Sequence, residues 1–212
     1  MNKSLHFLFD PLCGRCYGAT PAISELLEIR GITVTLLPTG LFSGERARSM
    51  DDDFATFAWS NDQRIERLTG QRFTERYRHR VLGDRRQFFD SGPATVALTA
   101  VSLTEPAREP EALKAFQHAR YVDGSDVTSL GTLAALLQDL DLKEAALMVA
   151  NPDAELFAAN RARIGRAQSL MQEFGARGVP TLIADSGAKR WMVNSTAAYS
   201  NPRALISQLE AV

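Results

Sequence analysis

Cysteine is scarce in this sequence, which has two cysteines, Cys13 and Cys16, among 212 residues. An excess of one charge is also lacking, because 24 basic residues face 25 acidic ones and leave a formal net charge of −1. No apolar run approaches the roughly 18 residues that a membrane-spanning helix needs. These absences argue against a secreted disulfide framework and a membrane span, and they give no reason to expect a nucleic acid or an anionic membrane as partner.

The first residues, "MNKSLHFLFDPLC", do not read as a secretion signal. Their apolar run is far shorter than the core of a signal peptide, and Asp10 and Pro11 follow it at once. We therefore expect a cytoplasmic protein. Cellular thiols would reduce a purely structural disulfide there, so two cysteines three residues apart suggest a reversible or catalytic pair.

Both ends of the chain combine strand and helix patterns. "SLHFLF" reads as a strand, the spacing is helical from Cys13 to Gly31, and "ITVTLL" reads as a second strand parallel to the first. Near the other end, a helix is expected over residues 153–174, with an apolar face formed by Phe157, Ile164, Ala167, Met171 and Phe174. "TLIAD" and "KRWMVN" then read as a hairpin, and Asn201 as the cap of a final helix.

The middle of the chain reads as helical. From about residue 44 to residue 151 there is helical periodicity and almost no strand signal, as in the apolar spacing of Leu130, Leu133, Ala134, Leu137 and Leu140. The pattern predicts one α/β domain, residues 1–43 and 152–212, interrupted by an all-helical insertion, residues 44–151. A combined length near 100 residues is typical of a domain.

The cysteine pair stands where a strand ends and a helix begins. Unpaired backbone N–H groups and the helix dipole favour a thiolate at Cys13, while Cys16, one turn further on, is close enough to form a disulfide and more shielded. Cys13 is therefore the expected attacking thiol and Cys16 the resolving one. Gly14 and Arg15, the residues between them, should tune the acidity of the pair, since Arg15 adds positive charge.

Other roles for the pair can be weighed directly. A zinc site needs about four ligands, and His6, His79 and His118 are not spaced as a partner set, so no metal is expected. A c-type haem would need histidine where Tyr17 stands. Two inert buried thiols stay open as an alternative, although a strand-to-helix junction is a poor place to bury both.

Two motifs resemble the thioredoxin superfamily. "CGRCYGATP", with Pro21 five residues after the second cysteine, resembles its active-site helix, and "ARGVPTLI" resembles its cis-proline loop. The long helical insertion, with "FQHARYVDGSDV" and "LGTLAALLQDLDL", is similar to the DsbA-like branch and its FrnE-like cytosolic subgroup. The resemblance implies a thioredoxin-like fold with a large helical insertion, and a thiol-disulfide oxidoreductase or dithiol-disulfide isomerase.

The resemblance also implies details of the site. Pro180 would be cis, and the backbone of Val179 would lie beside the sulfurs and pair with an extended substrate chain. Expected substrates are disulfide-containing or dithiol proteins and peptides, with no bound cofactor and with glutathione as a candidate co-substrate. The sequence departs from many relatives at Leu12, Gly14 and Arg15.

Several questions stay open at this point. The pair could be the switch of a redox-controlled binding or sensor module, or the chain could be a glutathione-dependent isomerase or transferase of the kappa-like branch. In that branch serine would stand where Cys13 is, which argues for redox chemistry here. The direction of electron flow and the oligomeric state also stay open.

Some further residues have two interpretations each. Asp10, three residues before Cys13, could cap the helix or belong to a proton path for the thiols, and capping is the favoured role. Eight arginines in the segment 64–86 fit a solvated helical face better than a nucleic-acid surface. The aromatic residues Phe54, Phe57 and Trp59 could line a groove, but core positions are the more common use of this spacing.

Overall fold

The two ends of the chain together form a four-stranded mixed sheet. The computed structural model describes residues 3–200 and 202–210. The strand order is β2-β1-β5-β6, with β1 and β2 parallel and the other pairs antiparallel. The strands are β1 (Lys3–Phe9), β2 (Ile32–Pro38), β5 (Thr181–Asp185) and β6 (Arg190–Val193). The predicted β-α-β start and the hairpin near the end are confirmed.

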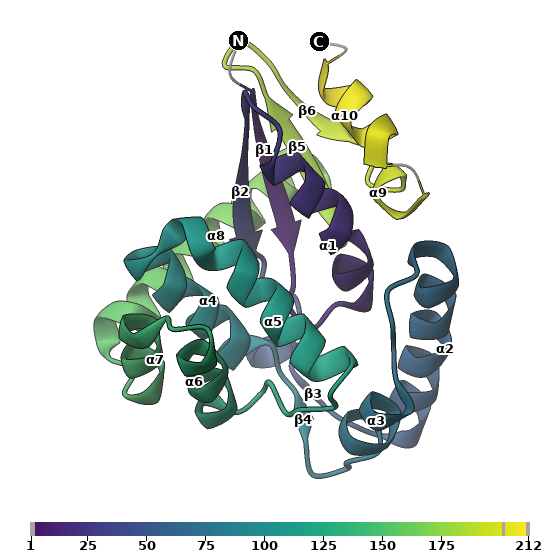
Figure 1. Ribbon diagram of the computed structural model, residues 1–212, viewed down its shortest axis with the longest axis vertical. Coiled ribbons are helices and arrows are strands. Elements are labelled where there is room, and N and C mark those ends of the chain that lie inside the picture. Colours follow the sequence, from purple (N-terminus) through teal and green to yellow (C-terminus); the bar gives the residue numbers. More distant parts are fainter. Residues whose placement is uncertain (1–2, 201, 211–212) are drawn as a thin grey trace.

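Helices cover both faces of this sheet (Figure 1). The helices α1 (Gly14–Leu27) and α10 (Pro202–Glu210) pack on one face, and α8 (Ala154–Glu173) lies on the other. Successive side chains of β1 point to opposite faces of the sheet. Phe7 therefore belongs to the core cluster shared with α1, while Leu8 packs against Ala167 of α8. The predicted cap Asn201 lies outside the described residues.

The middle of the chain forms the helical insertion that the sequence predicts, below the sheet in Figure 1. Its longer helices are α2 (Asp52–Thr69), α4 (Gly92–Thr104), α5 (Glu109–Tyr121), α6 (Leu130–Asp139) and α7 (Lys143–Ala150). Short turns of helix join them: η1 (Gly44–Arg46), α3 (Glu75–Tyr77), the wider turn η2 (Arg78–Leu82) and η3 (Pro106–Arg108). A small helix, α9 (Ala197–Ser200), precedes α10.

Two details of the prediction are wrong. The insertion contains a small antiparallel ladder, β3 (Arg48–Ser49) with β4 (Phe88–Phe89), which is too short to leave a period in the sequence. In α8, Phe157 does not belong to the buried face, since it is 39% exposed. The first half of α8 packs on α4, where Thr99 donates a hydrogen bond to Asn160, so Leu156 is buried instead.

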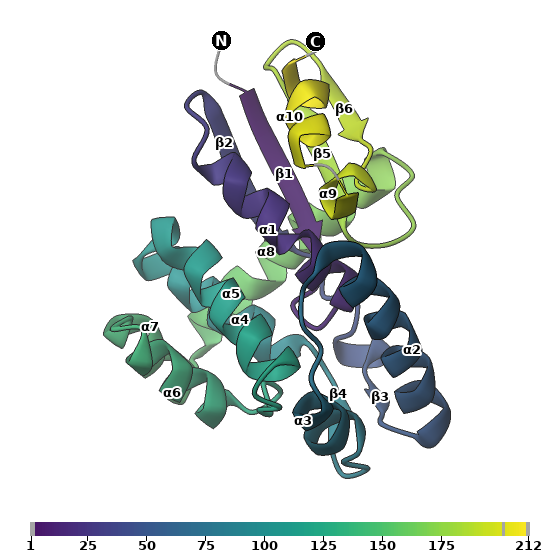
Figure 2. The same ribbon diagram turned by 45° about the vertical axis from the view of Figure 1, so that its right-hand side comes forward.

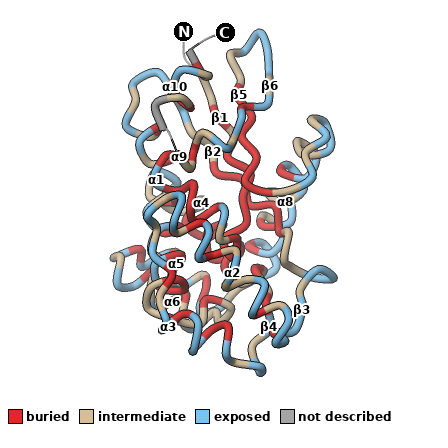
Figure 3. The backbone as a smooth tube through the Cα atoms, turned by 90° about the vertical axis from the view of Figure 1, so that its right-hand side faces the viewer, coloured by how far each residue is buried: buried red, intermediate tan, exposed pale blue. Residues whose placement is uncertain are grey.

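One hydrophobic core runs from the sheet into the insertion (Figure 3). The view in Figure 2 shows α2 standing beside the start of α1, and α2 contacts both α1 and α9. Within the described ranges, no helix is both long and apolar enough to cross a membrane. The boundaries 1–43, 44–151 and 152–212 stay a prediction.

Candidate active site

Both cysteines lie at the junction of β1 and α1. Cys13 is the N-cap residue of α1, with extended backbone angles, and its carbonyl accepts the first helical bond from the Tyr17 N–H at 3.0 Å. The helix continues through Pro21. Helix α1 has no acidic side chain in its first turn, so the positive end of its dipole faces Cys13 without a competing carboxylate from its own turn.

The two thiols differ in exposure. Cys13 is 9% exposed and Cys16 is completely buried. Burial raises the pKa of the Cys16 thiol well above its ordinary value, and its hydrogen bond to Cys13 and the charge of that neighbour raise it further. The expectation that this junction is a poor place to bury both cysteines is wrong, because side chains of the insertion cover it.

The loop before β5 comes close to Cys13. Strands β1 and β5 are antiparallel, so the end of β1 and the start of β5 meet at one edge of the sheet. The Cys13 Sγ lies 3.8 Å from the carbonyl oxygen of Val179, and the Val179–Pro180 peptide bond is cis, as the resemblance implies. The structure thus brings together all four of the residues expected to act on substrate, Cys13, Cys16, Val179 and Pro180.

Asp10 is fully buried beneath the junction. Its carboxylate accepts hydrogen bonds from the N–H groups of Leu12 (2.9 Å) and Phe42 (3.1 Å) and from the Ser91 hydroxyl (2.7 Å). Burial raises the pKa of Asp10, and these three donors and the charge of Arg120 oppose the rise. Capping of α1 is the wrong interpretation, because the donors that this carboxylate accepts from all lie outside α1. Asp10 instead ties the junction to the segment after β2 and, through Ser91, to the insertion.

A second buried carboxyl, Asp62, reaches the same place from α2. It is 6% exposed, and its Oδ2 accepts a hydrogen bond of 2.9 Å from the Tyr77 hydroxyl. A Cβ added at Gly14 would overlap Asp62 Oδ1, so glycine at this position leaves the room that the carboxyl occupies. Burial raises the pKa of Asp62 to about 7, although Tyr77 and the charge of Arg120 lower it.

A fully buried arginine, Arg120 of α5, lies among aromatic rings near these carboxyls. Its guanidinium carbon is 5.6 Å from the ring centre of Tyr77, 5.3 Å from that of Phe89 and 5.7 Å from that of Tyr121. The Tyr121 hydroxyl donates a 2.8 Å hydrogen bond to the carbonyl of Leu12, directly before Cys13. The insertion therefore places a buried cation and several rings against the cysteine motif.

A cavity of about 300 Å³ opens at Cys13. Its wall is mostly apolar and faces the cysteine motif and the loop before β5. It is lined by side chains of the insertion, Phe54, Phe57, Ala58, Ile65 and Phe89, and by Leu41 and Phe42 from the segment just before the insertion. Phe57 is 65% exposed, so the core interpretation of this residue is wrong. Trp59 points elsewhere, into a contact with Arg78. The exposed Arg15 also lines the cavity.

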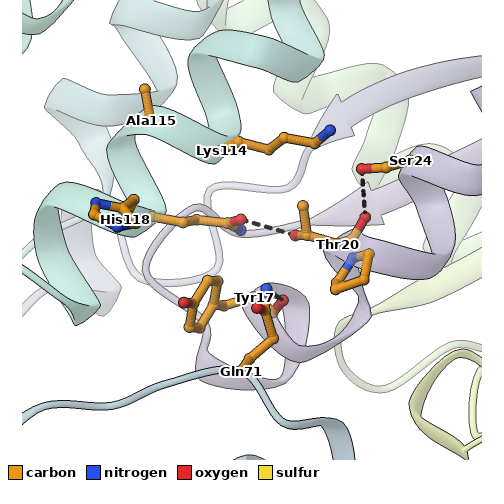
Figure 4. A pocket seen from close by; sticks show the side chains of 9 residues that line it. Tyr17, Thr20, Ser24, Gln71, Lys114, Ala115 and His118 are labelled. Atoms are coloured by element: carbon orange, nitrogen blue, oxygen red, sulfur yellow. Dashed lines mark hydrogen bonds between the residues drawn. The ribbon is translucent and has the colours of Figure 1, made fainter.

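A larger cavity, of about 460 Å³, lies on another side of α1 (Figure 4). Lys114 and His118 of α5 face Tyr17, Thr20 and Ser24 of α1 across it, and the Thr20 hydroxyl donates to Gln117 at 2.8 Å. Neither cysteine lines this cavity. The chemistry is therefore assigned to the smaller cavity, which contains Cys13.

Four residues of the site were not predicted from the sequence: Asp62, Tyr77, Arg120 and Tyr121. A signal for Asp62 exists, since it shares the buried face of α2 with Ala55 and Ile65, and an acid on an apolar helix face is unusual. The arginines of the segment 64–86 behave as predicted, with exposed ion pairs such as Arg78–Glu75 and Arg86–Asp84. In the described part of the chain, no three His, Cys, Asp or Glu residues gather as a metal site.

Solved structures of disulfide-exchange proteins resemble this one over nearly the whole chain. The cytosolic disulfide reductase DsbM from Pseudomonas aeruginosa has 30% sequence identity and a TM-score of 0.87, with 98% of this chain and 97% of that chain covered. The same protein with GSH gives 29% identity and a TM-score of 0.82, with 98% of each chain covered. The oxidoreductase DsbA from Xylella fastidiosa, at 14% identity and a TM-score of 0.56 over 100% of this chain and 88% of that one, shares the fold.

Searches against protein-family models and against curated proteins found no match.

Proposed function

Because the chain belongs to the DsbA-like thioredoxin-fold oxidoreductases and carries their redox-active cysteine pair, we propose that it reduces disulfides, with Cys13 as the attacking sulfur and Cys16 as the resolving one. The observation that carries these roles is the asymmetry of the pair. Cys13 lines the cavity, whereas Cys16 is completely buried behind it. A substrate sulfur can approach the first thiol and not the second.

The exchange takes two steps. The Cys13 thiolate attacks one sulfur of the substrate disulfide, that S–S bond breaks, a mixed disulfide forms, and the first substrate thiolate leaves and takes up a proton. The Cys16 thiol then gives up its proton and attacks the Cys13 sulfur, which releases the second substrate sulfur as a thiol. Two electrons pass from the cysteine pair to the substrate, and the pair ends as a disulfide.

Recycling needs a thiol reductant, and we assign this role to glutathione. One glutathione thiolate attacks the oxidised pair, and a second attacks the resulting mixed disulfide and leaves as glutathione disulfide, which restores both cysteine thiols. Support comes from the relative that was crystallised with GSH and from its description as a disulfide reductase. The same relative is called cytosolic, which agrees with the cytoplasmic location expected from the sequence.

The proposed substrate is a disulfide in a protein or peptide segment that is extended next to the cysteine. The backbone of Val179 lies beside the Cys13 sulfur and would pair with such a segment, as strands do in a sheet. The apolar wall of the cavity would hold apolar side chains beside the substrate cysteine.

Turnover with a peptide disulfide and glutathione tests the proposal. We expect many cycles per enzyme molecule for the natural sequence, a trapped Cys13 mixed disulfide for Cys16→Ala, and no exchange for Cys13→Ala, each followed by mass spectrometry. A mixed disulfide on Cys16 would overturn the assigned roles. A pair that reacts only once would favour the redox-switched binding module.

The reduction potential of the pair gives the direction of electron flow. Thiol trapping in glutathione buffers should give a midpoint within about −270 to −120 mV, the range of dedicated oxidoreductases, and towards its reducing end. A midpoint near −120 mV would mean an oxidant and would overturn the reductase assignment.

A further inference from the structure

The larger cavity, between α1 and α5, has no part in the proposed exchange. Its volume is about 460 Å³, which is in the range of small-molecule sites, and neither cysteine lines it. The α5 side carries Lys114, Gln117 and His118, whose spacing of three and four residues places them on one helix face. The α1 side includes Tyr17 and Pro21, and the two helices face each other across the space (Figure 4).

The amide group of Gln117 is the observation that points to a ligand. Its side chain is completely buried, and its Oε1 accepts a hydrogen bond of 2.8 Å from the Thr20 hydroxyl. The amide nitrogen, Nε2, is also buried and has no hydrogen-bond partner among the described residues. A buried N–H group without a partner is destabilising, so this cavity lacks an acceptor atom beside Gln117.

The charges around the cavity favour an anionic acceptor. Lys114 is exposed, and its side chain extends from α5 towards α1 (Figure 4). Glu111, which the charge of Lys114 reaches, is already held by Arg108 at 2.8 Å. The Nδ1 atom of His118 is paired with Asp123 at 3.0 Å. None of the described residues that line the cavity is acidic. A carboxylate is therefore the acceptor that fits the free amide and the lysine.

The rest of the wall suits an apolar group. Tyr17 is 6% exposed, and its ring stacks on that of Tyr121 with 4.8 Å between the ring centres, so the ring is held in place. Pro21 and Ala115 add apolar surface from the two helices. A ligand with an apolar body would lie against these side chains while its carboxylate reaches the amide of Gln117.

We propose that this cavity binds a small carboxylate with an apolar body, at a site separate from the catalytic cysteines. The Gln117 amide donates a hydrogen bond to the carboxylate, the Lys114 ammonium pairs with it, and the body packs on Tyr17. The ligand lies one helical turn from the resolving cysteine, because the Thr20 hydroxyl also contacts the Cys16 carbonyl at 3.0 Å. The inference does not depend on the proposed function, since neither sulfur takes part in binding.

The side-chain amide signals of a nitrogen-labelled sample test this inference, with hydrocinnamate as the probe. We expect the Gln117 amide signals to shift and to saturate as hydrocinnamate is added. Hydrocinnamide has the same body without the charge and should bind about tenfold more weakly. Phenylpropylamine, a cation, should leave the signals unchanged. Absence of a shift with hydrocinnamate would mean that water alone meets the amide and would overturn the inference, as would stronger binding of the amine.

Two variants test the individual contacts, with affinities measured by ligand-observed NMR. Gln117→Met keeps a side chain of similar size and removes the amide, so the affinity for hydrocinnamate should fall about tenfold. Lys114→Ala should lower it about two- to fivefold, and less at high salt, because the ammonium is exposed. The matched control is Lys143→Ala, an exposed lysine of α7, which should keep the natural affinity. An unchanged affinity in Gln117→Met would overturn the inference; if this variant does not fold, the amide signals of the natural sequence decide alone.

A cysteine variant separates this site from the proposed exchange. Cys13→Ala should bind hydrocinnamate with the natural affinity although it exchanges no disulfide, so loss of turnover leaves the inference standing. Shifts at Phe57 in place of Gln117 would put the probe in the smaller cavity and would overturn the inference. Stronger binding of the peptide acetyl-glycyl-phenylalanine than of hydrocinnamate would assign the site to the end of a protein chain and would overturn the choice of a small molecule.

Discussion

Two regions of the molecule supply the groups at the active site. In the region formed by β1, α1 and β5, these groups come from two short stretches of chain. In the helical insertion, they come from three separate helices. The first region contributes the two sulfurs and the backbone of Val179. The insertion contributes Asp62 from α2, Tyr77 from α3 and Arg120 from α5. These side chains carry most of the buried charge around Cys13.

The sheet region and the insertion contribute to the active site in different ways. The sheet region needs only correct backbone geometry to place a nucleophile, so its groups tolerate changes in their surroundings. The insertion places ionisable groups in a poorly solvated site, where each charge depends on its neighbours. Substitutions of the two sulfurs should therefore affect exchange more than stability, and substitutions of the buried ionisable groups in the insertion should affect stability and pH dependence.

The largest effect on stability is expected from Arg120→Leu. Removal of the buried cation leaves Asp10 and Asp62 without compensation, so we expect a loss of about 3–5 kcal/mol in the free energy of unfolding. The loss should be smaller in acid, where the carboxyls are protonated. Denaturant titration measures this loss of stability. The control is Arg76→Leu, which removes an exposed ion pair of 4.0 Å with Asp123 and should cost about 0–1 kcal/mol. Equal losses in the two variants would show that the buried arginine stabilises the protein no more than an exposed one.

A pH-dependent effect is expected from Asp62→Asn. The pKa of Asp62 is about 7 in the folded protein and its ordinary value is 3.8, so the folded state favours the protonated form. The stabilising contribution is complete below the ordinary value and is lost as pH rises through about 7. The variant cannot ionise here, so in the reduced protein it should gain on the order of 4 kcal/mol over the natural sequence at alkaline pH and nothing in acid. A difference independent of pH would contradict this reasoning.

Steric contact between the two regions is tested by Gly14→Ala. The new Cβ would overlap Asp62 Oδ1, so the buried Asp62 side chain must leave its place and give up its hydrogen bond from Tyr77, or α2 must shift. The expected cost is about 1–3 kcal/mol in the free energy of unfolding. Gly165→Ala is the matched control, because it lies inside α8 and its Cβ would meet open space. That control should gain about 0.5–1 kcal/mol from helix propensity. A stable Gly14→Ala protein would mean that Asp62 is free to move.

Sequence patterns predicted the sheet region well because its information is local. Strand alternation, the C-x-x-C spacing and the proline of "ARGVPTLI" each lie within about ten consecutive residues. The errors there concern the burial of Cys13 and the role of Asp10, because both residues contact side chains or backbone that lie far away in the sequence, which no local pattern encodes.

The insertion's part of the site could not be predicted in the same way. Periodicity predicted its helices. The charge of Arg120 acts on Asp62, however, only because α2 and α5 both pack against α1. Gly14 and Gly18 did offer a hint, since glycines four residues apart lie on one helix face and allow close packing. A Cβ at either position would collide with α2, at Asp62 or at Ile65.

The smallest effect on stability is expected from Phe57→Ala, which tests whether the insertion also selects substrates. The ring is 65% exposed at the cavity, so its removal should change the free energy of unfolding by less than about 0.5 kcal/mol. The KM for a peptide disulfide with an apolar neighbour to its cysteine should rise several-fold, and the KM for a hydrophilic peptide should stay constant. Leu147→Ala, on α7 and 64% exposed, is the control that should alter neither. If both KM values change equally, the ring contributes nothing to the choice between substrates. The insertion would then act on the site only through its buried charged groups.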